Sequence, residues 1–228
     1  MFRKFIRYFS RMELIILCSS LSLIILSFLI FDRSNYLTLI ASVLGSISLI
    51  FNAKGNPTGQ VLIIIFSLIY GYISFDFGYY GEMITYVGMS APMALFSLIS
   101  WLKNPYKGNH AEVKISSLSP FGVVLGFIFS GVVTLIFYFI LAYFNTANLI
   151  VSTISVSTRF LAAYFLFRRS PYFALAYAVN DIVLIVLWTL ASIEDISYMS
   201  VIICFTTFLI NDIYSFTNWK RMRKRQAE

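Results

Sequence analysis

The chain has 228 residues, of which 59% are hydrophobic and only 12% are charged, and its mean hydropathy is +0.83. A soluble domain carries about 25% charged residues, so this composition excludes a water-soluble globular protein and indicates an integral membrane protein. Two cysteines predict no disulfide framework, and one histidine offers no cluster that would bind a metal ion. The net charge of +7 could indicate a nucleic-acid partner, but its distribution along the chain favours another interpretation.

Eight apolar stretches are each long enough to cross a bilayer, because a transmembrane helix needs about 20 mostly apolar residues. Their continuous apolar runs lack a period-two alternation, which favours helices over the strands of a barrel. The predicted spans are 14–31, 36–53, 59–76, 82–102, 121–144, 147–167, 170–192 and 198–218. The sequence therefore predicts an all-α integral membrane protein with eight transmembrane helices.

Lysine and arginine collect on one side of this predicted arrangement. An even number of spans places both termini on the same side, and that side carries fifteen basic residues: Arg3, Lys4, Arg7, Arg11, Lys54, Lys103, Lys107, Lys114, Arg168, Arg169, Lys220, Arg221, Arg223, Lys224 and Arg225. The opposite side carries only Arg33. Because basic loops stay in the cytoplasm, both termini are predicted to be cytoplasmic in a multi-pass protein of the plasma membrane. The basic charge would then meet anionic lipid headgroups, and no nucleic-acid partner is expected.

Similar landmarks occur in the same order in the two halves of the chain. They are "LIASVLGSIS" (39–48) with "LIVSTISVST" (149–158), then Pro57 with Pro171, then Trp101 with Trp219. A unit of three helices would leave the next unit inverted in the membrane, but one further helix lies between the two copies and turns the second copy back. The repeats are therefore predicted to be parallel. The predicted organisation is a cytoplasmic segment with helix 1 (1–34), a three-helix repeat (35–104), a cytoplasmic loop with a linker helix (105–145), a second three-helix repeat (146–219) and a basic cytoplasmic tail (220–228). This is a 3+1+3 arrangement with an extra N-terminal helix.

Three ionisable side chains, Arg159, Asp181 and Asp212, lie well inside the predicted spans. Such a group costs roughly 2.5–3.5 kcal/mol at the centre of a membrane helix, so it normally faces a partner or a cavity. One interpretation pairs Arg159 with one or both aspartates. The alternatives are contact with a cation or polar substrate, and proton coupling, because two carboxylates exceed one guanidinium.

Amides and indoles accompany these charges. Asn180 and Asn211 each precede one of the aspartates, and each could bind a ligand or join two helices. Trp188 lies deeper in its span, where an indole can stack on a flat or cationic ring. Trp101 and Trp219 lie at helix ends, which is typical of anchors at the membrane interface.

The remaining candidates are weaker. The tyrosines Tyr70, Tyr72, Tyr86 and Tyr214 favour helix packing over ligand contact, and Gln60 is expected to be a cap or gate residue at the cytoplasmic side. The sequence contains no GxSxG motif, no P-loop and no metal-spaced His/Glu pair. The chain is therefore predicted not to be an enzyme, and no cofactor is expected.

The last two spans resemble a known transporter family. "NDIVLIVLWTLASIEDISYMSVIICFTTFLINDIYSFTNWKRM" (180–222) closely resembles the last two helices of the PnuC family of nicotinamide riboside transporters. "GYYGEMITYVGMSAPMALFSLISWLKN" (78–104) and "NHAEVKI" (109–115) are similar to that family's fourth helix and to its following linker. The family commonly has Asn or Gln and then Gly where this chain has Ala94 and Ser97.

The resemblance implies a fold similar to the SWEET sugar transporters and facilitated uptake of nicotinamide riboside, a precursor of NAD. It also implies that a cytoplasmic kinase traps the substrate, and that the chain assembles as a homotrimer. By position it places Asn180, Trp188 and Asn211 near the substrate, beside Asp181 and Asp212. The changed fourth helix leaves thiamine, riboflavin or a deoxyribonucleoside as alternative ligands. A membrane-embedded enzyme and a non-transporting receptor are the alternatives of another class.

Overall fold

The computed structural model describes residues 8–33, 35–76 and 80–228. The predicted cytoplasmic segment before residue 8, with Arg3, Lys4 and Arg7, lies outside the described residues. Parts of two predicted loops, at 34 and 77–79, also lie outside them.

The described residues form eight helices, or runs of helix, that are long and apolar enough to cross a membrane. They are α2 (Arg11–Phe31), α3 (Tyr36–Ala53), α4 (Thr58–Asp76), α5 with η1 and α6 (Tyr80–Ile84, Thr85–Ser90 and Ala91–Leu102), α7 (Pro120–Tyr143), α8 (Leu149–Phe167), α9 (Tyr172–Ser192) and η2 with α10 (Ile196–Tyr198 and Met199–Ala227). The predicted all-α membrane fold with eight spans is confirmed. The last helix is longer than expected, because it continues to Ala227 through the predicted tail at 220–228.

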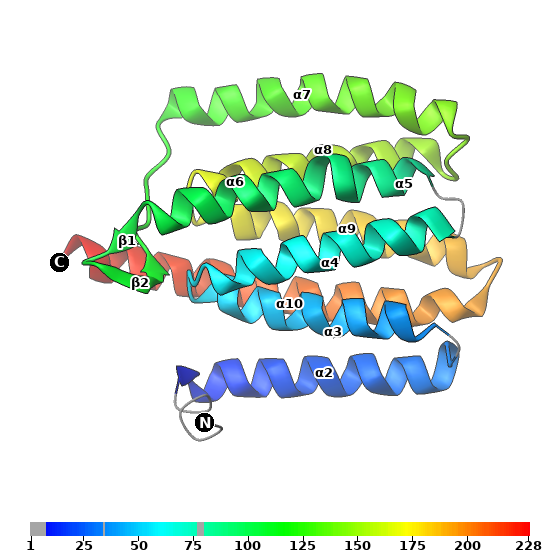
Figure 1. Cartoon of the computed structure of the whole chain (residues 1–228), viewed down its shortest axis with the longest axis horizontal. Helices are drawn as coiled ribbons and strands as arrows, with labels where there is room; N and C mark the ends of the chain where they lie inside the picture. The colour runs from blue at the N-terminus through cyan, green and yellow to red at the C-terminus, as the bar shows by residue number, and fades with distance from the viewer. Residues whose placement is uncertain (1–7, 34, 77–79) are drawn as a thin grey trace.

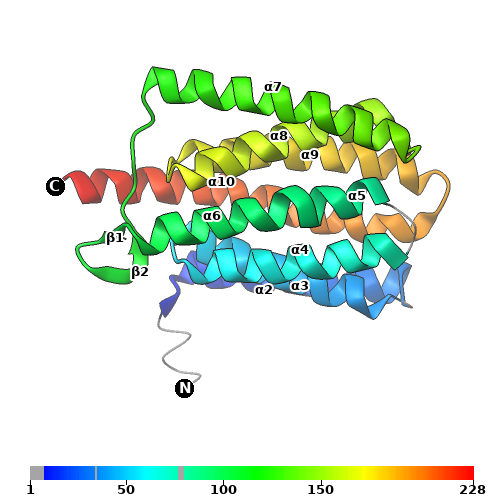
Figure 2. The same ribbon diagram turned by 45° about the horizontal axis from the view of Figure 1, so that its top comes forward.

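The helices run along one common axis, with α7 on one side of the bundle and α2 on the other (Figures 1 and 2). The start of α2, the C terminus and a small hairpin lie together at one end (Figure 1), which we call the hairpin end. Along α7, large apolar side chains such as Phe127, Leu135 and Phe139 are more than half exposed. Hydrocarbon is the solvent that suits such a surface.

Local sequence explains where two of the outer helices begin. Ser10 caps α2 in a reciprocal capping box, because its hydroxyl accepts from Glu13 N at 3.3 Å and its backbone N donates to Glu13 Oε2 at 2.7 Å. Ser119 caps α7 and Pro120 occupies its first turn, where a missing N–H costs nothing.

The fourth span is interrupted by the π-helical segment η1, which the sequence analysis did not predict. Pro92 follows it and lacks the N–H that would continue the regular hydrogen-bond ladder. The N–H of Ala91 instead bonds to Tyr86 O, five residues back. The wider turn places Tyr86 and Met89 in the interior of the bundle, each with 5% of its surface exposed.

The loops from α3 to α4 and from α8 to α9 contain matching hydrogen bonds. Gly55 N donates to Asn52 O at 2.9 Å, and Arg169 N donates to Leu166 O at 2.9 Å. Gly55 and Arg169 also share a positive φ, 66° and 58°. Further pairs are Asn56 N to Phe51 O with Ser170 N to Phe165 O, and Gln60 N to Pro57 O with Ala174 N to Pro171 O. This agreement supports the predicted parallel repeat, which stays a prediction.

A two-stranded hairpin stands where only a cytoplasmic loop was expected. Strand β1 (Pro105–Tyr106) pairs antiparallel with β2 (Asn109–Val113). Val113 is fully buried, and its N–H donates to Gly55 O at 2.9 Å while its carbonyl accepts from Gln226 Nε2 at 3.0 Å. The hairpin therefore joins the loop after α3 to the end of α10.

Candidate functional site

A pocket with a volume of about 90 Å³ lies between helices from both halves of the chain. Side chains of α3, α4, η1 and α6 form one part of its wall, and side chains of α8, α9 and α10 form the other. Six of the ten predicted site residues line this pocket: Gln60, Tyr86, Arg159, Asn180, Asp181 and Asp212.

Asp181 on α9 and Asp212 on α10 bring two carboxyl groups side by side in this pocket. Only 4% and 2% of their surfaces are exposed, and their side chains interact directly. Asp181 Oδ2 and Asp212 Oδ1 accept no hydrogen bond from any donor in the part of the chain that the structure describes. The two carboxyl groups thus lie at the wall of the pocket with acceptor oxygens that no donor of the described residues satisfies.

The expected ion pair between Arg159 and an aspartate is wrong: among the described residues no nitrogen of Arg159 lies within 4.0 Å of a carboxylate oxygen. Arg159 contacts Tyr86 instead. Its Nη2 donates to the Tyr86 hydroxyl at 3.3 Å, and its guanidinium lies 4.6 Å from the centre of the tyrosine ring. The face of the tyrosine ring attracts the guanidinium group. An ion pair would attract it too, but would require a carboxylate to lose its water as well.

Tyr86 and Arg159 also line a second cavity, of about 20 Å³, toward the end of the bundle opposite the hairpin. Glu82 and Trp188 line only this second cavity. The Tyr86–Arg159 pair therefore separates the two cavities, and we call it the partition.

The two asparagines that the sequence pairs have different surroundings. Asn180 lines the pocket, and its Oδ1 accepts from Thr158 Oγ1 at 3.0 Å. Asn211 is fully buried outside the pocket lining, where its Nδ2 donates to Ser20 Oγ at 3.2 Å and to Thr207 O at 2.9 Å. Asn211 thus joins α10 to α2, which is the helix-joining alternative that the sequence left open.

Three further candidates also lie outside the pocket lining. Trp188 packs against Tyr198 with ring centres 5.2 Å apart, and the Tyr214 hydroxyl donates to Glu13 Oε1 at 3.1 Å. Trp101 is 1% exposed, so the interfacial anchoring expected for it and for Trp219, which is 0% exposed, is wrong. The hairpin and the opposite half of the chain cover both indoles.

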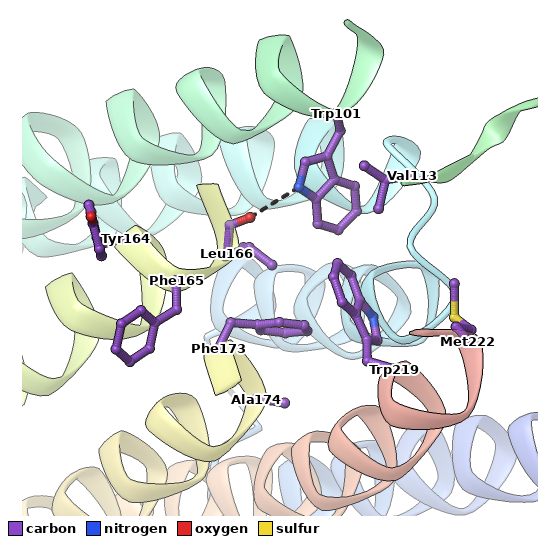
Figure 3. Close-up of a cluster of buried hydrophobic side chains, with 9 residues drawn as sticks. All are labelled: Trp101, Val113, Tyr164, Phe165, Leu166, Phe173, Ala174, Trp219 and Met222. Atoms are coloured by element: carbon purple, nitrogen blue, oxygen red, sulfur yellow. Dashed lines mark hydrogen bonds between the residues drawn. The ribbon is translucent and has the colours of Figure 1, made fainter. Parts of the chain in front are cut away.

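Both indoles belong to one apolar cluster at the hairpin end (Figure 3). Trp101 Nε1 donates to Leu166 O at 3.2 Å, and Trp219 Nε1 donates to Asn52 O at 2.8 Å. The ring centres of the two tryptophans are 5.5 Å apart, and Phe173 lies 4.8 Å from Trp219. Leu166 and Phe173 also line the pocket, so this tryptophan cluster borders the pocket toward the hairpin.

Sequence reasoning missed several polar residues of the pocket. Asn52, Ser67 and Ser97 line it, and all three are buried. Serine is an ordinary residue in membrane helices because its hydroxyl usually bonds to a carbonyl of the preceding turn. Two signals were available: Gln60 and Ser67 are seven residues apart and therefore on the same face of α4, and Ser97 departs from the residue that the resembled family commonly has.

Eight membrane-spanning helices around a pocket that carries buried polar side chains are typical of a membrane transporter. Residues 35–221 match the sequence model of the Nicotinamide mononucleotide transporter family. The chain belongs to that family, and it is a multi-pass membrane protein. Membership of a transporter family agrees with the prediction that the chain is not an enzyme.

Two individual relatives agree with this assignment. The nicotinamide riboside transporter PnuC of Neisseria mucosa is 24% identical over 202 residues, which cover 87% of this chain and 77% of the relative. A crystal structure of the vitamin B3 transporter PnuC superposes with a TM-score of 0.81 at 23% identity, covering 96% of this chain and 94% of that one. The resemblance to the PnuC family predicted from the sequence is confirmed.

Proposed function

We propose that this chain carries nicotinamide riboside across the plasma membrane by facilitated transport. The observation that carries the proposal is the unsatisfied acid pair, Asp181 and Asp212, inside a pocket between both halves of a transporter. Nicotinamide riboside contains a cationic pyridinium ring, a carboxamide and a ribose. Carboxylates offset the charge of the ring, and the amide of Asn180 can bond to the carboxamide. The name of the relative from Neisseria mucosa supports this choice of substrate.

The pocket favours the nucleoside over the mononucleotide for which the family is named. A phosphate group offers only acceptor oxygens and brings negative charge. The two carboxyl groups of the pocket would repel it, and the guanidinium of Arg159 already lies against Tyr86. A ligand that is cationic and rich in hydroxyl donors fits the same atoms.

Aromatic side chains provide surfaces for the flat ring. Phe66, Phe205 and Phe208 line the pocket together with Tyr86. Offset stacking or edge contact with such rings contributes about 0.5–1.5 kcal/mol beyond the burial of area. Because Trp188 lies outside the pocket lining, we assign ring contact to these phenylalanines and to Tyr86.

The hairpin end is proposed to be cytoplasmic. The predicted charge bias supports this direction, since Lys54, Lys103, Arg168 and Arg169 are loop residues at that end and Arg33 follows α2 at the other. The resemblance to PnuC further suggests that a cytoplasmic kinase traps the substrate and that the chain forms homotrimers. Both of these belong to the proposal.

The decisive experiment is uptake of labelled nicotinamide riboside into proteoliposomes that contain the purified chain, with protein-free liposomes as control. Facilitated transport predicts entry until the inner and outer concentrations are equal, without ATP or an ion gradient. Unlabelled nicotinamide riboside should compete, and the mononucleotide should not. Flux of thiamine, riboflavin or a deoxyribonucleoside without flux of nicotinamide riboside would overturn the proposed substrate. Accumulation driven by a pH gradient would overturn facilitated transport.

A further inference from the structure

The half of the pocket formed by α4 and α6 carries polar atoms that the proposed ring contacts do not use. We infer that Gln60, Ser67 and Ser97 form a site that binds the hydroxyl groups of the ligand's sugar, and we call it the hydroxyl site. The inference rests on the proposed function, because it assigns the ribose of a nucleoside to these three side chains. It names the residues that would distinguish a ribonucleoside from its deoxy analogue.

The three side chains are buried and unpaired. Gln60 and Ser97 are 0% exposed and Ser67 is 1% exposed, and all three line the pocket. Gln60 Oε1, Ser67 Oγ and Ser97 Oγ have no hydrogen-bond partner among the described residues. Most buried polar groups in native proteins are paired, and here three unpaired atoms belong to residues that line the same pocket, where a ligand could supply the missing partners.

The two serines differ from three other buried serines, Ser48, Ser155 and Ser215, although Ser46 Oγ, outside the pocket lining, is unpaired as well. Ser48 Oγ donates to Gly45 O at 2.6 Å, Ser155 Oγ to Ser152 O at 2.7 Å, and Ser215 Oγ to Asn211 O at 2.8 Å. These bonds to the preceding turn are the usual way in which a membrane helix satisfies a serine. Ser67 and Ser97 make no such bond, so their hydroxyl groups remain available to the pocket.

Gln60 is held in place by Asn52. Its Nε2 donates to Asn52 Oδ1 at 2.8 Å, which fixes the amide and leaves Oε1 as the unpaired acceptor. The side chain of Asn52 occupies the space beside Gly59, where an added Cβ would lie 2.2 Å from Asn52 Oδ1. Glycine at 59 therefore makes room for Asn52, and Asn52 orients Gln60.

This set of atoms matches a sugar. A carbonyl oxygen accepts from a sugar hydroxyl, and each serine hydroxyl can both donate to and accept from one. The acid pair lies on α9 and α10, which pack against each other, as α4 and α6 do. The ligand would therefore bind with its cationic ring toward Asp181 and Asp212 and with its ribose toward the hydroxyl site.

The test combines protein variants with ligand analogues. Affinity for nicotinamide riboside and for its 2′-deoxy and 3′-deoxy analogues is measured by calorimetry on Ser67→Ala, Ser97→Ala and Gln60→Leu. Each variant should bind nicotinamide riboside roughly tenfold more weakly, the effect of one lost hydrogen bond to a ligand. For the analogue that lacks the hydroxyl bound by the substituted side chain, the variant and the unaltered chain should have the same affinity. Ser48→Ala, which removes a buried hydroxyl outside the pocket lining, is the matched control and should leave affinity unchanged.

Thermal unfolding without ligand separates this role from a structural one. Removing an orphaned hydroxyl relieves an unpaired buried group, so Ser67→Ala and Ser97→Ala should keep or raise the Tm of the free protein. Equal losses for the riboside and for both deoxy analogues, or no loss at all, would overturn the hydroxyl site while leaving the proposed function intact. Absence of any nicotinamide riboside binding to the unaltered chain would instead overturn the proposed function, and the hydroxyl site with it.

Discussion

Different kinds of contact border the pocket at its two ends. Toward the hairpin, the indole N–H groups of Trp101 and Trp219 donate to backbone carbonyls. Aromatic rings pack around the two indoles (Figure 3). At the opposite side the partition consists of two side chains, Tyr86 and Arg159, joined by one hydrogen bond and one ring contact. The partition is a contact between two side chains, whereas the contacts at the hairpin end involve backbone carbonyls at helix ends.

The bonds at the hairpin end also cross between the two halves of the chain. Trp101 and Ser100, at the end of α6, donate to the last carbonyls of α8. Trp219 and Asn218, on α10, donate to Asn52 O and to the carbonyl of the following residue at the end of α3. Each half thus donates hydrogen bonds to helix-terminal carbonyls of the other, in addition to the loop bonds that Asn52 O and Leu166 O accept from Gly55 N and Arg169 N. Stability should therefore depend on the hairpin end, and transport on the partition.

The largest effect is expected from Trp219→Ala. The side chain is fully buried, so its loss should reduce the free energy of unfolding by about 3–5 kcal/mol. Equilibrium unfolding in detergent measures the change. Trp188→Ala is a suitable control because Trp188 lies away from the cluster and is partly exposed. A loss under about 1 kcal/mol for Trp219→Ala would contradict the claim that the hairpin end holds the halves together.

Gly59→Ala should have the next largest effect. The added Cβ would lie 2.8–2.9 Å from Asn52 Cγ and N as well as 2.2 Å from its Oδ1, so the start of α4 must shift away from α3. Such overpacking costs typically about 1–3 kcal/mol, measured as a loss of unfolding free energy. Gly131→Ala, on α7, is the matched control, because a Cβ added at Gly131 would meet no atom within 4 Å. Equal stability of the two variants would show that the space beside Asn52 is not limiting.

Tyr86→Phe should change transport more than stability. It removes the hydroxyl that accepts from Arg159 and keeps the ring under the guanidinium, so the free energy of unfolding should fall by only about 1 kcal/mol. Because the partition then opens more readily, the initial rate of uptake into proteoliposomes should rise at saturating substrate. An unchanged rate together with unchanged substrate affinity would mean that the partition does not control access.

Hydropathy and length were sufficient to predict the eight spans, because every helix that crosses a bilayer must be apolar and about 20 residues long. The π-helical turn before Pro92 was not predictable, because the same proline could equally have kinked a regular helix. The buried tryptophans were misjudged for a related reason. An indole followed by basic residues is typical of the membrane interface. Here, tertiary contact with the other half of the chain buries both indoles instead.

The candidate site shows the same limit. Asn180–Asp181 and Asn211–Asp212 are alike in sequence, and neighbouring residues point about 100° apart around a helix. On α9 both side chains reach the pocket, whereas on α10 only Asp212 does. The difference arises because α2 covers the face of α10 that carries Asn211, through the bond to Ser20. Which face a neighbouring helix covers is a property of the assembled bundle, and local sequence does not encode it.

The smallest effect is expected at the outermost contact of the hairpin end. Glu112 on β2 forms an ion pair with Arg225 and also accepts from Gln226 Nε2 at 2.8 Å. The Arg225 side chain is 57% exposed and that of Glu112 is 17% exposed, and an ion pair whose cation is open to solvent in this way contributes only about 0–1 kcal/mol. Glu112→Gln should therefore lower the unfolding free energy by less than about 1 kcal/mol, and added salt should shrink the difference because it screens the charges. A loss of several kcal/mol would instead place the hairpin, rather than the tryptophan cluster, at the centre of the contact between the halves.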